Sequence, residues 1–290
     1  MKVAVLSLDI EDWYHLDYFR KLACDRSQSL LDGVNVYFHV LARYGIRSSC
    51  FVLGELIAAL RSQLAEIVRQ GHDLGVHGWD HARPLEMTRE EFARDLQRCK
   101  GALEDAIGAP AIGYRAPCFS LDKDRLDVVK TAGFGYDTSR ILFRGHPLYG
   151  TLELPDYLEV APNIFRKDSF FEFQVSTLTL LGREVPVAGG GYLRIFPWLL
   201  MRRLITSYLN QGQLYVLYIH PYELSPRPTP RLPAGAPARC RLRFGMGRAT
   251  VAEKLAALIE LLQKNGYRFT TFAALRNELL LQPDGASTHG

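Results

Sequence analysis

The chain has 290 residues, of which 48% are hydrophobic and 23% charged, a composition typical of ordinary globular proteins. Its formal net charge of +4 is small for a nucleic-acid-binding surface, so we expect no nucleic-acid partner. The five cysteines form no C-x-x-C pair and are odd in number, which argues against a disulfide framework or a zinc ribbon.

The N-terminal apolar run, residues 3–8, is too short for a secretory signal. No stretch of about 18 apolar residues predicts a transmembrane helix. Because free thiols are also typical of a reducing compartment, we expect a cytoplasmic protein.

Short apolar strands alternate with amphipathic helices along the chain. We predict strands over 3–8, 49–53, 73–76, 112–115, 135–137, 214–219 and 268–271. We predict helices over 32–45, 56–68, 88–107, 122–132, after Pro197 and over 251–264. The helix over 88–107 starts at Thr88 with Glu91 three residues later, which is the spacing of a capping box. This alternation, with roughly seven units, favours an α/β fold, a distorted (β/α)7-type barrel. An open dinucleotide-binding sheet is disfavoured because no glycine-rich fingerprint follows the first strand.

Two segments interrupt the alternation. Residues 140–195 contain a strand-like run, 170–175, and the stretch Gly189-Gly190-Gly191-Tyr192, and we expect an insertion over the barrel mouth. Residues 225–248 are rich in proline and arginine without periodicity, which predicts a long ordered loop or a mobile flap. Its arginines either are solvated or meet an anionic substrate group. We interpret residues 1–290 as one domain.

Three carboxylates, Asp9, Glu11 and Asp12, follow the first predicted strand within four positions. In a parallel barrel the carboxyl ends of strands open into the active-site mouth. Like charges are costly there unless they share a cation or a proton. The alternative is that these residues cap the following turn.

His77 and His81 are four residues apart, which on a helical turn places both on one face, where they can bind one ion. A pair on a helix surface is the alternative. Two histidines and a carboxylate are the ligand set of hydrolytic zinc sites and of non-haem iron oxygenases. The additional carboxylate favours hydrolysis, because a hydrolase needs a base for the attacking water.

Arg115 and His220 each end a predicted strand and should therefore project into the barrel mouth. Arg115 could orient a carboxylate base, or it could form a structural ion pair. His220 suits a general acid that protonates a leaving amine, or it could be a core histidine.

Taken in chain order, these motifs resemble the polysaccharide deacetylase superfamily, the NodB-homology group or carbohydrate esterase family four. That family has an acidic strand end, an H-x-x-x-H, an R-x-P, an aspartate-bearing stretch and a late strand ending in histidine. The closer resemblance is to the branch associated with exopolysaccharide and O-antigen gene clusters. It is carried by D-I-E-D-W at 9–13, R-A-P-C-F at 115–119, Y-D-T-S at 136–139, G-G-G-Y at 189–192 and H-P-Y-E at 220–223.

The resemblance implies a divalent metal, usually zinc, held by His77, His81 and one acid of the first motif. The usual first motif is two adjacent aspartates, but here Ile10 follows Asp9. The ligand is then Glu11, which shares a strand face with Asp9, or Asp12, and we favour Glu11 slightly.

The resemblance also implies the catalytic groups. Asp9 would be the base, Arg115 would hold Asp9, His220 would be the acid, and Asp137 would tune His220 or line the pocket. We expect sugar-stacking residues among the aromatic side chains beside the motifs, although aromatic residues are as often part of the core: Trp13, Tyr14, Trp79, Phe119 and Tyr192.

The implied activity is removal of an N-acetyl group from an amino sugar of a bacterial surface polysaccharide. The substrate would be nucleotide-linked, lipid-linked or an oligosaccharide. Two alternatives remain at this point: a related amidase or deformylase acting on another amide, and a sugar-binding barrel without catalysis.

Overall fold

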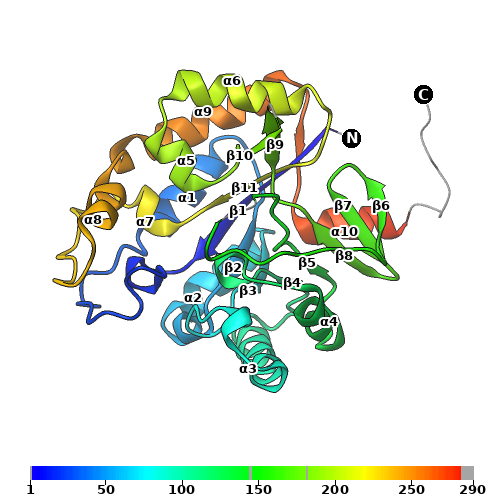
Figure 1. Cartoon of the computed structure of the whole chain (residues 1–290), viewed down its shortest axis with the longest axis horizontal. Helices are drawn as coiled ribbons and strands as arrows, with labels where there is room; N and C mark the ends of the chain where they lie inside the picture. The colour runs from blue at the N-terminus through cyan, green and yellow to red at the C-terminus, as the bar shows by residue number, and fades with distance from the viewer. Residues whose placement is uncertain (1, 144–145, 181, 282–290) are drawn as a thin grey trace.

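The computed structural model describes residues 2–143, 146–180 and 182–281 (Figure 1). Its main sheet has a parallel part in which neighbouring strands follow the order β11-β1-β2-β3-β4-β5, with β12 also paired to β1. These strands are β1 (Val3–Ile10), β2 (Ser49–Val52), β3 (Asp73–Val76), β4 (Gly113–Tyr114), β5 (Tyr136–Asp137), β11 (Tyr215–Ile219) and β12 (Arg268–Phe269). Every residue of β1 and β11 is buried, as expected for strands covered on both faces.

The sheet continues beyond β5 into the segment predicted as an insertion. β8 (Phe170–Phe173) pairs parallel with β5, and β7 (Ile164–Lys167) and β6 (Leu158–Ala161) follow antiparallel at the edge. No ladder joins β8 directly to β11 among the described residues. The isolated bridge between Ile141 and Val175 extends the β5–β8 pair, and the bridge between Gly189 and Tyr218 joins the segment before α5 to β11. The predicted α/β barrel class is therefore confirmed, as a curled and incompletely closed barrel.

The helices lie outside the sheet (Figure 1). In the first half α2 packs on α3 and α3 on α4, and in the second half α9 packs on both α5 and α6. The helices are α1 (Gly33–Ala42), α2 (Gly54–Arg69), α3 (Arg89–Ile107), α4 (Lys123–Thr131), α5 (Gly190–Ile195), α6 (Trp198–Leu209), α7 (Pro221–Leu224), α8 (Ala238–Gly245), α9 (Val251–Lys264) and α10 (Phe272–Leu280). The predicted capping box at Thr88 is present, since its Oγ1 accepts from the N–H of Glu91 and the Glu91 carboxylate accepts from the N–H of Thr88.

The expectation that residues 140–195 lie over the barrel mouth is only partly correct. The strands β6, β7 and β8 extend one edge of the sheet, and β9 (Thr177–Leu180) and β10 (Arg183–Pro186) form a separate two-stranded hairpin. Residues 146–149, 191, 192 and 194 do reach the mouth. Residues 144–145 and 181 of this predicted insertion, and residues 1 and 282–290 of the predicted domain, lie outside the described residues.

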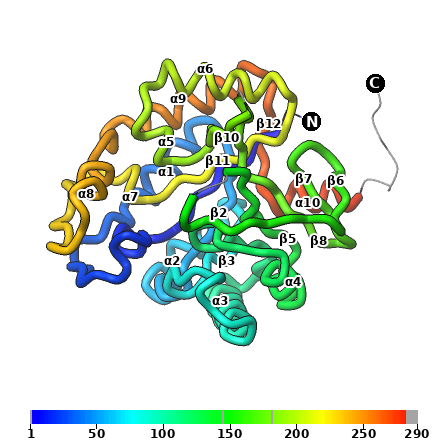
Figure 2. Tube along the Cα trace, in the orientation of Figure 1, coloured from blue at the N-terminus to red at the C-terminus, as the bar shows by residue number. Residues whose placement is uncertain are grey.

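The prediction of a long ordered loop or a mobile flap over residues 225–248 is wrong for the second half of this segment, where residues 238–245 form α8. The sequence signal was weak because α8 buries only one side chain, Phe244. Phe244 packs with Trp13, Phe19 and Tyr222 in a small second cluster of buried apolar residues, so residues 11–30 lie beside α8 (Figure 2). Among the described helices none combines the length and the apolar character needed to cross a bilayer.

Candidate metal centre and active site

The C-terminal end of β1 supplies the acids of the site. Along an extended strand alternate side chains share a face, so Ser7, Asp9 and Glu11 all point toward the barrel interior. Asp9 and Glu11 are almost completely buried and line the same cavity. The parallel pairing of β1 with β2 and β11 fixes the position of this strand end.

His77 and His81 come from the loop that follows β3. The prediction of a helical turn is wrong here, because Gly78 and His81 both have left-handed backbone angles, with φ of 79° and 65°. The loop is held by the N–H groups of Gly54 and Glu55, which donate to the carbonyls of Gly78 and Trp79. A left-handed backbone conformation at a non-glycine residue costs about 1–2 kcal/mol of free energy. At His81 this conformation directs the imidazole ring toward Glu11.

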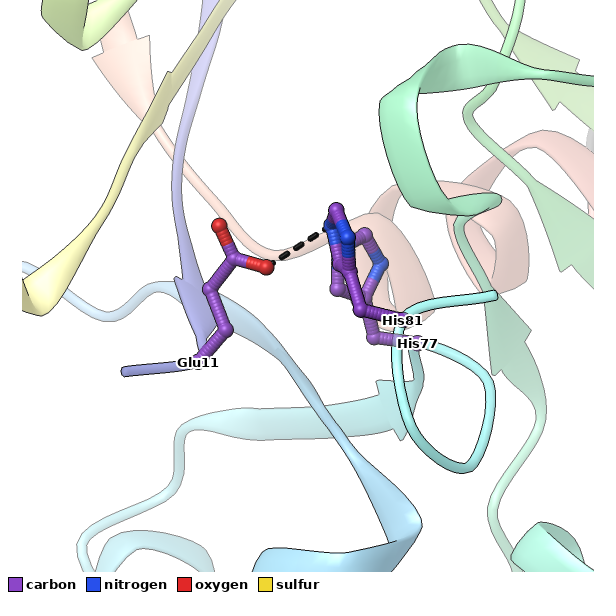
Figure 3. Close-up of side chains that lie close together, drawn as sticks. All are labelled: Glu11, His77 and His81. Atoms are coloured by element: carbon purple, nitrogen blue, oxygen red, sulfur yellow. Dashed lines mark ion pairs between the residues drawn. The ribbon is translucent and has the colours of Figure 1, made fainter. Parts of the chain in front are cut away.

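Glu11, His77 and His81 form a cluster with the geometry of a metal site (Figure 3). One ligand atom from each residue can be chosen so that all three lie within 4.8 Å of one another. Nε2 of His81 lies 2.8 Å from Oε2 of Glu11, and the two imidazole centroids are 5.3 Å apart. Nδ1 of His77 donates to the carbonyl of Arg115 at 2.9 Å, which leaves Nε2 with its lone pair.

The electrostatics of the cluster also suit a cation. Burial alone would raise the pKa of Glu11, but the neighbouring His81, with His220 and His77, lowers it to about 2. Burial lowers the pKa of His77 to about 4, so its imidazole is neutral at neutral pH, as a metal ligand must be. Oε2 of Glu11 is buried and lies 2.8 Å from Nε2 of His81, so both atoms can face one ion. Two imidazoles and a carboxylate therefore fit a divalent metal such as zinc.

Asp12, the second candidate ligand, does not belong to this cluster. Its Oδ1 accepts from the N–H groups of Trp13 and Leu30, at 2.8 and 2.9 Å. Asp12 caps a short 3-10 helix, Trp13–His15, and this is the turn-capping role that carboxylates after a strand commonly have.

Asp9 is held by Arg115. Nη1 of Arg115 lies 2.7 Å from Oδ1 of Asp9 and 2.8 Å from Oγ of Ser7, and the Arg115 side chain is completely buried. Nε and Nη2 of Arg115 point toward Thr138, at 3.3 Å from its carbonyl and 3.5 Å from its hydroxyl. These contacts fix the carboxylate and balance its charge in the barrel interior.

His220 lies across the cavity from the histidine loop, with Nε2 3.6 Å from Oε1 of Glu11. Its Nδ1 is bound to Oε2 of Glu223 at 3.0 Å. Burial would lower the pKa of His220, but the hydrogen bond to Glu223 and the negative charges of Glu223, Glu11 and Asp9 raise it to about 9. Oε1 of Glu223 lies 3.2 Å from Nε of Arg194, so a buried chain of His220, Glu223 and Arg194 supports the imidazole.

The expectation that Asp137 tunes His220 or lines the pocket is wrong. The carboxylate of Asp137 accepts from the N–H and hydroxyl of Ser139, and it shares a hydrogen bond with Glu172 on the paired strand β8. Burial raises the pKa of Asp137, and burial together with the charge of Asp137 raises the pKa of Glu172 well above its usual value. Glu223 has the place beside His220 that we expected for Asp137.

One cavity of about 490 Å³ contains the site, a volume typical of small-molecule pockets. Of the predicted aromatic residues, Phe119 and Tyr192 line it. Trp13 and Tyr14 belong to the second buried cluster, and Trp79 lies against Gly54 and under the guanidinium of Arg98, outside this cavity.

Several residues that line the cavity, and Glu223, which binds His220 from behind it, were not singled out from the sequence. Glu223 could have been found, because Pro221 and the i, i+3 spacing of His220 and Glu223 are signals of a helix start with a capping box. Arg239 and Arg243 belong to the segment 225–248, for whose arginines we expected either solvation or contact with an anionic substrate group. The other residues carry no local signal: Tyr18, His146, Tyr149, Arg194 and Tyr218.

The fold and the site define an α/β half-barrel with a histidine–histidine–carboxylate cluster in its mouth. Residues 31–136 match the family described as polysaccharide deacetylase, so this part of the chain is similar to polysaccharide deacetylase domains. Residues 139–276 match a family described as a domain of unknown function, DUF3473. His77, His81 and Arg115 lie within the first match and His220 within the second, whereas Asp9 and Glu11 precede both.

The chain is similar to a peptidoglycan deacetylase-like protein of Gibberella zeae, with 28% identity over 37% of this chain and 32% of that protein. It is similar to a peptidoglycan deacetylase of Helicobacter pylori, with 27% identity over 37% of this chain and 36% of that protein. The similarity thus spans about a third of the length of each relative. A putative polysaccharide deacetylase from Mycobacterium smegmatis has the same fold, with a TM-score of 0.64, 16% identity, and coverage of 96% of this chain and 90% of that one.

Proposed function

We propose that this protein is a metal-dependent hydrolase that removes the N-acetyl group from an amino sugar. One observation carries the proposal: a single cavity contains the Glu11–His77–His81 cluster, the Arg115-bound carboxylate of Asp9, and His220. The similarity to polysaccharide deacetylase domains and the relatives named for peptidoglycan deacetylation support this class of reaction.

Glu11, His77 and His81 would hold the metal. When bound, a zinc-type ion supplies a Lewis acid that polarises the amide carbonyl and increases the acidity of water. Two imidazoles and one carboxylate leave coordination positions open, as catalytic rather than structural zinc sites do.

The chain's own side chains move the protons. Asp9 accepts a proton from the water that attacks the acetamide carbon, and Arg115 keeps the carboxylate oriented for this transfer. His220 gives a proton to the nitrogen as the C–N bond breaks, while Glu223 holds its Nδ1. The products are acetate and a free amino sugar. Phe119 and Tyr192 provide aromatic faces against which a sugar ring can stack.

We also propose that the substrate belongs to exopolysaccharide or O-antigen biosynthesis and meets the enzyme in the cytoplasm as a nucleotide-linked, lipid-linked or oligosaccharide precursor. The motif resemblance supports the pathway class. The five cysteines are free, which supports a reducing compartment. A single large hydrophobic core contains residues from β1 to α10 and supports the proposal of one domain.

The test is the product of reaction. Purified protein is incubated with N-acetylated sugars, and acetate, formate and free amine are quantified, with Asp9→Asn as the inactive control. We expect acetate and amine in equal amounts. Formate release from a formamido sugar in place of acetate would identify a deformylase, and sugar binding without either product would identify a non-catalytic barrel.

A further inference from the structure

Helix α8 presents two positive charges to the cavity. Arg239 and Arg243 are four residues apart and therefore share one face of α8, and both line the cavity that contains the acids and histidines. Arg241 lies between them in sequence, and its guanidinium donates instead to the carbonyls of Ala236, Pro233 and Ala234. Arg241 therefore stabilises the local backbone, whereas Arg239 and Arg243 face the cavity.

The helix that carries these charges is anchored to the barrel. Phe244 is completely buried in the second cluster, where it stacks on Tyr222. Nη1 of Arg194 donates to the carbonyls of Arg243, Phe244 and Met246 at the C-terminal end of α8. Because the same Arg194 binds Glu223, the position of α8 is tied to that of His220. Arg239 and Arg243 are therefore on a fixed element rather than on a flap.

The two cavity-facing charges are not compensated. Arg239 and Arg243 are exposed, and neither has an acidic partner among residues 2–143, 146–180 and 182–281. The nearby Arg194 and Arg227, in contrast, pair with Glu223 and Asp32.

Within the lining, no described acid balances these arginines. Besides Asp9 and Glu11, the lining contains one acid, Asp17, and it is bound to Arg20 and Arg83. Burial, and then the charge of Arg243, lowers the pKa of His146, so this neighbour is neutral at neutral pH. The side of the cavity lined by Arg239, Arg243 and His146 therefore carries a net positive charge. A neutral sugar has no group that complements this charge.

We propose that the substrate carries an anionic group beside the acetamido sugar, and that Arg239 and Arg243 bind this group while the acetamide lies at the Glu11–His77–His81 cluster. Guanidinium groups bind phosphate and carboxylate through paired hydrogen bonds, so either anion fits. The phosphate would belong to a nucleotide or lipid carrier, and the carboxylate to a neighbouring uronic acid. This inference rests on the proposed function, because it names the class of sugar that the same site accepts.

The test compares binding of three probes to the full chain by calorimetry. UDP-N-acetylglucosamine provides phosphate, a disaccharide of glucuronate and N-acetylglucosamine provides a carboxylate, and diacetylchitobiose is neutral. The variant is R239Q/R243Q. The matched control is R202Q/R203Q, which removes the same charge from two exposed arginines of α6 that do not line the cavity. Acetate release is measured in the same samples.

We expect one anionic probe to bind about tenfold or more tightly than the neutral probe, and R239Q/R243Q to lose that advantage without weakening neutral binding. The anion that shows the effect identifies its source, and R202Q/R203Q should behave as wild type. Equal affinity for all three probes, no binding of either anionic probe, or an equal loss for anionic and neutral probes would overturn the anion site. Acetate release from the neutral probe would then leave the deacetylase proposal intact, whereas arginine-dependent binding without acetate from any probe would overturn deacetylation instead.

Discussion

The Glu223→Gln substitution tests the support of His220. Glu223 has no exposed surface and uses its two carboxylate oxygens for different partners, Oε1 for Arg194 and Oε2 for His220. Glutamine has the same shape but only one oxygen. Either His220 or Arg194 must therefore face an NH2 group, which cannot accept a hydrogen bond.

We expect Glu223→Gln to lower both the turnover rate and the free energy of unfolding. A positioned general acid contributes about 10²–10⁴-fold, so turnover should fall by about this factor if His220 loses its orientation. Removing the charge that balances buried Arg194 should cost up to about 3–5 kcal/mol, reduced by the three carbonyls that Arg194 retains.

The assay measures acetate release and bound metal for wild type and Glu223→Gln, with urea unfolding to establish that the variant is folded at the assay temperature. Glu90→Gln, an exposed change on α3, is the matched control and should keep wild-type values. The reasoning is refuted if folded Glu223→Gln turns over within about threefold of wild type, or if its loss of activity follows from loss of metal.

The remaining predictions concern other parts of the site and the fold. His77→Ala should bind metal more than about 100-fold more weakly, which exceeds the usual effect of an outer-shell change, as equilibrium dialysis would show; full occupancy would contradict the ligand assignment. Asp9→Asn should keep the metal but lower turnover by about 10²–10⁴-fold in the acetate assay. Because the folded state raises the pKa of Glu172, its contribution to stability is present below about pH 4.5 and is lost as the pH rises, by up to about 1.4 kcal/mol per unit. Urea unfolding in a pH series above about pH 4.5 should therefore show a steeper loss of stability in wild type than in Glu172→Gln. Thr88→Ala should cost about 1 kcal/mol in urea unfolding through loss of the α3 cap, and an unchanged midpoint would contradict that role.

The sequence predicted those parts of the fold that depend on local pattern. The apolar run of β1, the capping box at Thr88 and the amphipathic pattern over 251–264 each correspond to an element with nearly the predicted bounds. Helix α8 was missed because its one buried residue, Phe244, packs on Trp13 and Tyr222, which are distant in sequence. Periodicity within a segment carries no information about such a partner.

In the candidate site too, the sequence predicted what depends on local pattern but not what depends on residues distant in sequence. Strand alternation correctly grouped Asp9 with Glu11, but the i, i+4 spacing of His77 and His81 suggested a helical turn where the chain forms a left-handed loop. Asp137 was expected beside His220 because of its place in a motif. Its actual partner, Glu172, is set by the pairing of β5 with β8, which only the tertiary structure reveals.

The most direct test of the central claim is metal stoichiometry measured together with acetate release, before chelation, after chelation and after return of zinc. Wild type should contain about one divalent ion per chain. Acetate release should stop with chelation and return with zinc, and Asp9→Asn should bind the same ion without turnover. Acetate release that persists at full rate in metal-free protein would contradict the account, as would a chain that binds no divalent metal under any loading condition.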